Sequence, residues 1–244
     1  MACAPAAQAI FREVAMEYLP GGLTLHVPPE AFPLSTDSAV LAHFVRLPKN
    51  ARVLDLGSGC GTLGLMLCAK NETCTVTGVE IDPAAHAAAL DNIARNGLQL
   101  RLNSVCADLR VFSPEHGAYH VCVSNPPYFS GGPASATHPL ARQDDACPPE
   151  VLFAAAGRAV KYGGDVFIVH KPEKLAQLIT CAGKNGLEAK RLRLVRHRPD
   201  GPPALILLHF KKGGKPGLTW DEQCLYTSSG EQTPYFKEVY HMEP

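Results

Sequence analysis

The sequence predicts an α/β fold with a mainly parallel sheet and helices on both of its faces. Three observations lead to this prediction. Short runs rich in β-branched residues alternate with helical patterns, which is typical of strand–helix–strand units. The composition, 46% hydrophobic and 19% charged residues, is that of a globular domain with a substantial core. The last two apolar runs are too close together for a crossover helix, so we expect them to pair as an antiparallel hairpin at the sheet edge.

The predicted elements follow one another in a regular order, and right-handed crossovers between them would give a doubly wound sheet. We expect seven strands, at residues 52–56, 75–80, 100–107, 119–124, 165–170, 189–196 and 204–210. We expect helices at 63–70, 83–96, 148–162 and 171–184, and an earlier one from Ser35 or Thr36 to about Val45. Gly163 and Gly164 are expected to end the 148–162 helix, and a small hairpin is expected near residues 23–27.

The length of 244 residues favours one domain, residues 1–244. Ahead of the first sheet strand lies a short extension, about residues 1–50. The loop-rich tail, about residues 213–244, shows no clear pattern.

Charge and cysteine content restrict the function. The net charge is zero, which is low for a general nucleic-acid binder, although the positive charge gathers in the C-terminal half. The nine cysteines include no C-x-x-C pair, so we expect reduced, buried thiols and no metal site. The first basic residue is Arg12, and the longest aliphatic run is residues 204–208. We therefore expect no signal peptide, no membrane span and a cytoplasmic protein.

A glycine-rich loop follows the first predicted sheet strand. Its spacing is D-x-G-x-G-x-G, with Asp55, Gly57, Gly59 and Gly61. Glycines allow a sharp turn and a close approach of ligand to backbone. The spacing differs from the G-x-G-x-x-G of dinucleotide folds, and the carboxylate of Asp55 disfavours a phosphate, so NAD is not expected. A cationic ligand without phosphate, such as S-adenosylmethionine, fits better.

Two further strand ends carry acidic residues. Glu80 ends the second sheet strand, where a carboxylate can accept hydrogen bonds from both ribose hydroxyls. Asp108 follows the third, where it can accept from the adenine amino group, and Leu109 beside it completes the candidate cofactor site. Three acidic strand ends in register favour S-adenosylmethionine as the cofactor.

The motif after the fourth strand is the candidate catalytic site: Asn125, Pro126, Pro127 and Tyr128. The amino nitrogen of an adenine or a carboxamide is planar and weakly nucleophilic. Two acceptors aimed at its N–H bonds would favour the pyramidal geometry that attack on a methyl group requires. The Asn125 side-chain oxygen and the Pro126 carbonyl can supply them, the two prolines stiffen the loop, and Tyr128 offers a stacking face.

Together these motifs resemble class I N-methyltransferases of the adenine and glutamine type. Further segments resemble bacterial valine-tRNA adenine-N6-methyltransferases, and the resemblance covers roughly residues 20 to 242. Its weaker motifs are residues 35–42, 141–142, 161–164, 171–172, 186–187, 190–193, 213–214 and 240–242. The resemblance implies a Rossmann-like fold, S-adenosylmethionine as cofactor and an RNA substrate, with tRNA favoured, whose adenine is methylated at N6. It also implies that Thr36 and Asp37, besides capping a helix, close over the cofactor.

Several alternatives remain open. The same catalytic motif occurs in release-factor-type glutamine methyltransferases, but these usually have a longer N-terminal domain than the ~50 residues present here. A small-molecule N-methyltransferase and an inactive RNA-binding module are further alternatives. Residues 190–198, with five basic side chains, are either a phosphate-contacting edge strand or an ordinary solvated one. Arg142 either contacts substrate phosphate or is simply solvated.

Overall fold

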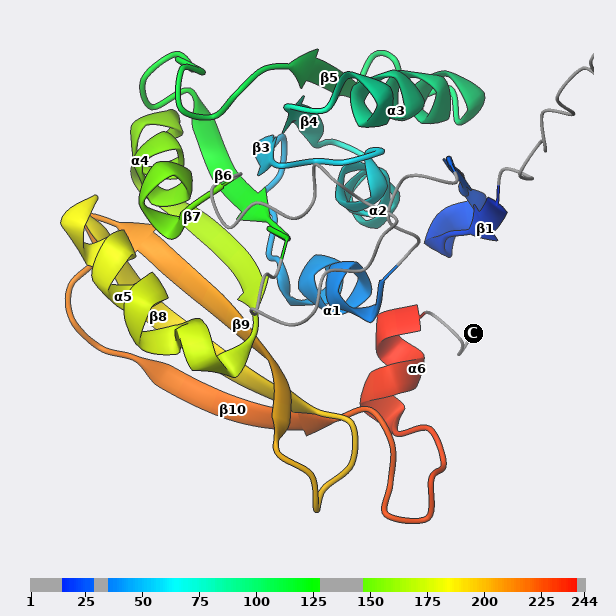
Figure 1. Ribbon diagram of the computed structural model, residues 1–244, viewed down its shortest axis with the longest axis vertical. Helices are drawn as coiled ribbons and strands as arrows, with labels where there is room; N and C mark the ends of the chain where they lie inside the picture. Colours follow the sequence, from blue (N-terminus) through cyan, green and yellow to red (C-terminus); the bar gives the residue numbers. More distant parts are fainter. Residues whose placement is uncertain (1–14, 29–34, 128–146, 241–244) are drawn as a thin grey trace, which may run out of the picture.

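A computed structural model of the chain describes residues 15–28, 35–127 and 147–240. Its centre is an eight-stranded sheet in the order β10-β8-β9-β7-β6-β3-β4-β5 (Figure 1). β9 is antiparallel to both neighbours, and every other neighbouring pair is parallel. The sheet strands are β3 (Arg52–Leu56), β4 (Thr75–Glu80), β5 (Leu102–Cys106), β6 (Tyr119–Ser124), β7 (Val160–His170), β8 (Leu187–Arg196), β9 (Pro203–Lys212) and β10 (Thr219–Cys224).

Helices cover both faces of the sheet, as the sequence predicts. The helices are α1 (Thr36–Phe44), α2 (Thr62–Lys70), α3 (Pro83–Arg95), α4 (Pro149–Ala159), α5 (Leu175–Lys184) and α6 (Pro234–Tyr240). One core cluster joins α1, α2, α3 and α6 to one face, and a second joins α4 and α5 to the other. Two single-turn 3-10 helices, Pro20–Gly22 and Pro172–Lys174, complete the elements.

The expected small hairpin exists as a separate two-stranded sheet. β1 (Ala15–Tyr18) pairs antiparallel with β2 (Thr24–Val27). The side chain of Asn92 on α3 fixes its position, because it accepts from the His26 amide at 2.8 Å and donates to the His26 carbonyl at 3.0 Å. None of the described helices combines the length and the apolar character needed to cross a membrane.

Two expectations about the later elements need correction. β8 and β9 pair antiparallel as predicted, but they do not form the edge, because β10 from the C-terminal tail adds an eighth strand beside β8. The helix expected to reach residue 162 ends at Ala159, and Val160 already has extended backbone angles and begins β7. The paired glycines therefore belong to the strand: a Cβ on Gly164 would lie 2.8 Å from the His120 carbonyl oxygen, so glycine lets β7 pass close to β6.

Candidate active site

The candidate site lies where β3, β4, β5 and β6 end. These four strands are parallel neighbours, so their carboxyl ends meet at one edge of the sheet. Asp55 pairs in register with Gly78 on β4 and with Val123 on β6, which brings the acidic and the amide-bearing strand ends side by side. The Ser124 hydroxyl donates to the Leu56 carbonyl at 2.6 Å and ties the end of β6 to that of β3.

The glycine loop has the conformation that its sequence predicts. Gly57, Gly59 and Gly61 have φ angles of 75°, 55° and 87°, in the left-handed region that favours glycine. The amides of Gly57 and Ser58 both donate to the Val79 carbonyl, at 2.9 and 3.1 Å, which holds the loop against β4. A Cβ on Gly57 or Gly59 would meet no atom of the described residues within 4 Å. The space beside the loop is therefore open to a ligand.

Two carboxylates with different environments border the loop. Asp55 is 1% exposed, and burial together with the charge of Glu80 raises its pKa to about 7. Its Oδ2 atom and the Ser58 hydroxyl are buried and have no hydrogen-bond partner among the described residues. Glu80, by contrast, accepts from the Gly59 amide at 2.7 Å and from the Asp82 amide at 2.9 Å. The site therefore has two neighbouring carboxyl groups, Asp55 and Glu80, and two buried polar atoms that remain available to a ligand.

The third acidic strand end has a competing partner. Asp108 follows β5, and its carboxylate binds the Arg110 guanidinium in bidentate fashion at 2.8 to 3.0 Å. This pair lowers the pKa of Asp108 and keeps its carboxyl ionised. Leu109 between them is buried, at 8% exposure, against the α4 face. An adenine amino group would have to share Asp108 with Arg110.

The candidate catalytic side chain is oriented by a residue that sequence reasoning missed. The Asn125 side-chain amide donates to the hydroxyl of Ser38 on α1 at 3.0 Å. Ser38 is 7% exposed and lies 87 residues away along the chain. It takes up an N–H of the amide, so the amide nitrogen faces α1. Two features of the sequence point to Ser38: its place inside an apolar helix and its membership of the segment 35–42 that carries the family resemblance.

The two prolines that follow Asn125 continue the chain from the same edge of the sheet. Pro126 is buried and Pro127 is exposed, so the chain emerges at the surface here. Tyr128, like Arg142, lies outside the described residues.

The start of α1 meets the C-terminal tail near the same edge. Ser35 caps the helix by accepting from the Ser38 amide at 3.3 Å, so the cap is Ser35 and not Thr36. Thr36 instead accepts from the hydroxyl of Tyr240 on α6, at 3.1 Å. Asp37 lies in the first turn, where an acidic side chain interacts favourably with the helix dipole. Thr36 and Asp37 are thus within one turn of Ser38, the partner of Asn125.

Comparison with known proteins assigns this arrangement to a family. Residues 34–180 match the family model "Methyltransferase small domain". The chain belongs to this methyltransferase family. Its curated relatives include tRNA1(Val) (adenine(37)-N6)-methyltransferases of Tolumonas auensis, 31% identical over 84% of this chain and 87% of that one, and of Bacteroides fragilis, 31% identical over 74% and 77%.

A solved structure agrees on the fold of this methyltransferase. A protein described as a predicted O-methyltransferase from Agrobacterium tumefaciens superposes with a TM-score of 0.71 at 20% identity. The match covers 84% of this chain and 96% of that one.

Proposed function

We propose that this methyltransferase transfers a methyl group from S-adenosylmethionine to the N6 amino group of an adenine in tRNA. The observation that carries this proposal is the relation of Asn125 to the glycine loop. The amide that can hold a planar amino group follows β6. The strand beside it carries a buried carboxyl oxygen of Asp55 that has no hydrogen-bond partner in the described ranges. Family membership and the printed activity of the relatives support the same reaction.

The residues present fit a cationic cofactor. Burial and, second to it, the charge of Glu80 raise the pKa of Asp55, and a bound ammonium would favour the ionised carboxylate. Each Glu80 oxygen accepts one backbone amide and keeps a second lone pair for a ribose hydroxyl. We assign the remaining contacts to Gly57, Gly59 and Gly61, to Asp108 and Leu109, and to Thr36, Asp37 and Asn125. S-adenosylmethionine supplies the methyl group as part of a sulfonium.

The residues of the catalytic motif act on the amino group. Ser38 takes an N–H of the Asn125 amide, which orients Oδ1 as the end that accepts a hydrogen bond from one N–H of the adenine amine. The Pro126 carbonyl accepts a hydrogen bond from the other N–H, and Pro127 restricts the loop so that both acceptors are set before the substrate arrives. The nitrogen releases one of these protons to water once it carries the methyl group. Tyr128 stacks on the base. The lone pair of the amine then points away from both acceptors and toward the methyl group.

We further propose that the enzyme acts on tRNA in the cytoplasm. It does so as a single domain, residues 1–244, and its reaction uses no metal ion.

Nucleoside analysis tests the proposed function directly. The purified protein is incubated with unmodified tRNA transcripts and S-adenosylmethionine carrying a deuterated methyl group, and the digested nucleosides are identified by mass spectrometry. We expect labelled N6-methyladenosine in a valine tRNA transcript. Label found only on glutamine side chains of added protein extract, or on no nucleoside, would contradict the proposal.

A further inference from the structure

A pocket of about 480 Å³ lies between the end of α1 and the middle of β8, and its lining does not include Asn125, Pro126 or Pro127. We refer to it as the α1–β8 pocket. Its lining residues are His43, Phe44, Val45, Arg46, Leu47, Lys70, Asn71, Arg191 and Arg193. The lining includes four cationic side chains, those of Arg46, Lys70, Arg191 and Arg193, and no carboxylate.

Positive charge exceeds negative charge around the pocket. Arg191 and Arg193 share a single carboxylate, that of Asp221 on β10, through contacts of 2.5 to 3.0 Å. Arg46 is exposed and forms no ion pair within the described part of the chain. Lys70 binds only carbonyl oxygens, and burial together with the charge of Arg46 lowers its pKa to about 8. Among the described residues, four cationic side chains therefore face the carboxylate of Asp221, while that of Glu238 lies 3.7 Å from the lining residue His43.

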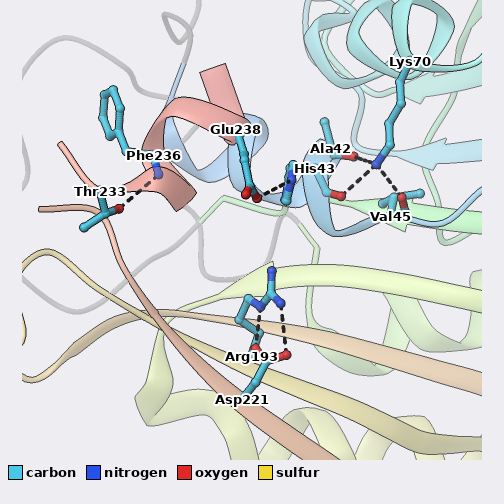
Figure 2. A network of polar contacts seen from close by, with 9 residues as sticks. All are labelled: Ala42, His43, Val45, Lys70, Arg193, Asp221, Thr233, Phe236 and Glu238. Carbon is cyan, nitrogen blue, oxygen red and sulfur yellow. Dashed lines mark hydrogen bonds and ion pairs between the residues drawn. The ribbon is translucent and has the colours of Figure 1, made fainter. Parts of the chain in front are cut away.

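The structure holds Lys70 and Arg191 in fixed positions. Lys70 donates to the carbonyls of Ala42, His43 and Val45 at 2.7 to 2.8 Å, at the end of α1 (Figure 2). The guanidinium of Arg191 lies over the Phe44 ring, 4.7 Å from its centroid. A site that is already ordered loses little side-chain entropy when an anion binds.

The alternation of side chains along β8 explains which of its basic residues line the pocket. Side chains alternate between the two faces of a strand, so Arg191 and Arg193 share the α1 face while Arg196 lies on the other. Arg196 pairs with Glu222 at 3.2 Å and does not line the pocket. The hypothesis of one basic edge along residues 190–198 is therefore wrong: β8 is not an edge strand, and its cations are divided between two faces.

Helix α1 connects the pocket to the catalytic motif. Ser38 binds Asn125, and Phe44, six residues later, lines the pocket. Six residues of α-helix span about 9 Å. This is the axial length of fewer than three stacked bases at ~3.4 Å each. The part of α1 that lines the pocket therefore lies about 9 Å along the helix from the residue that binds Asn125, a length that a short stretch of RNA backbone can span.

We propose that the α1–β8 pocket binds a backbone phosphate of the RNA substrate, close to the adenine that is methylated. The inference rests on the proposed function, since it takes RNA as the substrate. Arg46 and Lys70 have no carboxylate partner among the described residues and supply the charge. Arg191 supplies a planar donor group suited to phosphate oxygens.

Charge reversal at Arg46 tests the proposal. Arg46→Glu changes an exposed side chain that no ion pair in the described chain engages, so the fold should survive. Arg158→Glu is the matched control, because Arg158 is also exposed but lies on α4, on the opposite face of the sheet. Binding of a valine tRNA transcript is measured by fluorescence anisotropy across a salt titration, in parallel with calorimetry of S-adenosylmethionine and of inorganic phosphate alone.

We expect Arg46→Glu to weaken tRNA binding about tenfold or more and to reduce the salt slope by ~0.7–0.9 for each phosphate that the variant no longer neutralises. Cofactor affinity should not change, and Arg158→Glu should bind tRNA like the wild type. Equally weakened binding in both variants would overturn the proposal, since it would indicate a general effect of net charge. Arg46-dependent binding of inorganic phosphate alongside Arg46-independent tRNA binding would overturn it too, and would indicate a free anion site.

The same experiment separates this inference from the proposed function. Wild-type protein that binds tRNA through Arg46 but methylates no adenine would refute the proposed reaction and support the pocket. Wild-type protein that methylates adenine with RNA affinity independent of Arg46 would refute the pocket alone.

Discussion

The Glu80 carboxylate accepts a hydrogen bond from the backbone amide of Gly59 at 2.7 Å. The end of β4 thereby fixes the middle of the glycine loop that follows β3. The other carboxylate oxygen of Glu80 accepts from the backbone amide of Asp82, the N-cap residue of α3. The Glu80 side chain therefore connects the glycine loop, β4 and α3. Glu80 is therefore both a structural residue and a candidate ligand of the cofactor.

Glu80→Ala should lower both stability and cofactor affinity. It leaves the amides of Gly59 and Asp82 without their acceptor, which costs about 1–3 kcal/mol in the free energy of unfolding. Urea denaturation measures the first effect and calorimetry with S-adenosylmethionine the second. Glu72→Ala, at an exposed site on the turn after α2, is the control and should change neither. Unchanged cofactor affinity in a folded Glu80→Ala protein would remove Glu80 from the site.

Cofactor binding should depend on pH through Asp55. Its pKa is raised to about 7 in the free protein, and a bound cation favours the ionised carboxylate. Below pH 7 binding must therefore release a proton, so affinity should rise as pH increases toward 7, by at most about tenfold per unit, and level off above it. Calorimetry in buffers of different ionisation heat measures the proton release. Asp55→Asn should bind weakly and with a flat pH profile; a wild-type slope in that variant would assign the titration to another group.

Stability should show the opposite trend. The unfolded chain ionises Asp55 near its usual pKa of 3.8, whereas the folded protein holds the proton up to about pH 7. Between these values the folded state binds more protons, so Asp55 makes the protein less stable as pH rises through this window. In Asp55→Asn this contribution should vanish, which urea denaturation at pH 5 and pH 7.5 can detect.

Ser38→Ala should slow methyl transfer without weakening cofactor binding. The variant loses the acceptor that orients the Asn125 amide, a neutral hydrogen bond worth ~1 kcal/mol, or about fivefold in rate. Single-turnover kinetics on tRNA measure the effect. Ser104→Ala, which removes a buried hydroxyl on β5 bonded to His86 on α3, should keep the wild-type rate. The double variant with Asn125→Ala should be no slower than Asn125→Ala alone, because Ser38 acts through Asn125.

Asp221→Ala should destabilise the fold more than Glu222→Ala on the same strand. Asp221 pairs with Arg193, which is 8% exposed, whereas Glu222 pairs with Arg196 at the surface. We expect a decrease of about 1–3 kcal/mol in the free energy of unfolding for Asp221→Ala and below about 1 kcal/mol for Glu222→Ala. Urea denaturation compares them. Equal decreases in the free energy of unfolding would contradict this expectation, because the ion pair of buried Arg193 with Asp221 would then stabilise the fold no more than the exposed pair does.

The central strands could be predicted because parallel strands are buried on both faces and appear as continuous apolar runs. The predicted bounds of β3, β4 and β6 agree with the structure. β10 could not be predicted in this way, because its sequence TWDEQC has no apolar alternation. Its place depends on long-range pairing of Asp221 with the arginines of β8, and the run of basic residues on β8 was the only local sign that an acidic strand covers it.

The candidate site was predictable where a residue's chemistry is tied to a strand end. Asp55, Glu80, Asp108 and Asn125 belong to or follow neighbouring parallel strands, so periodicity alone brings them to one edge. The contacts of Ser38 with Asn125 and of Tyr240 with Thr36 were not predicted, because they join segments far apart in sequence. Arg110 was missed for a different reason: its pairing with Asp108 depends on the local loop conformation after β5.

The most direct test of the mechanism is the single-turnover rate of methyl transfer to tRNA by Asn125→Ala compared with the wild type. If the Asn125 oxygen accepts a hydrogen bond from the adenine amine, its removal should cost ~3 kcal/mol, or about two orders of magnitude in rate. Calorimetry should show cofactor affinity within a few fold of the wild type. Rates that agree within threefold would contradict this mechanism, because another group would then have to hold the amine.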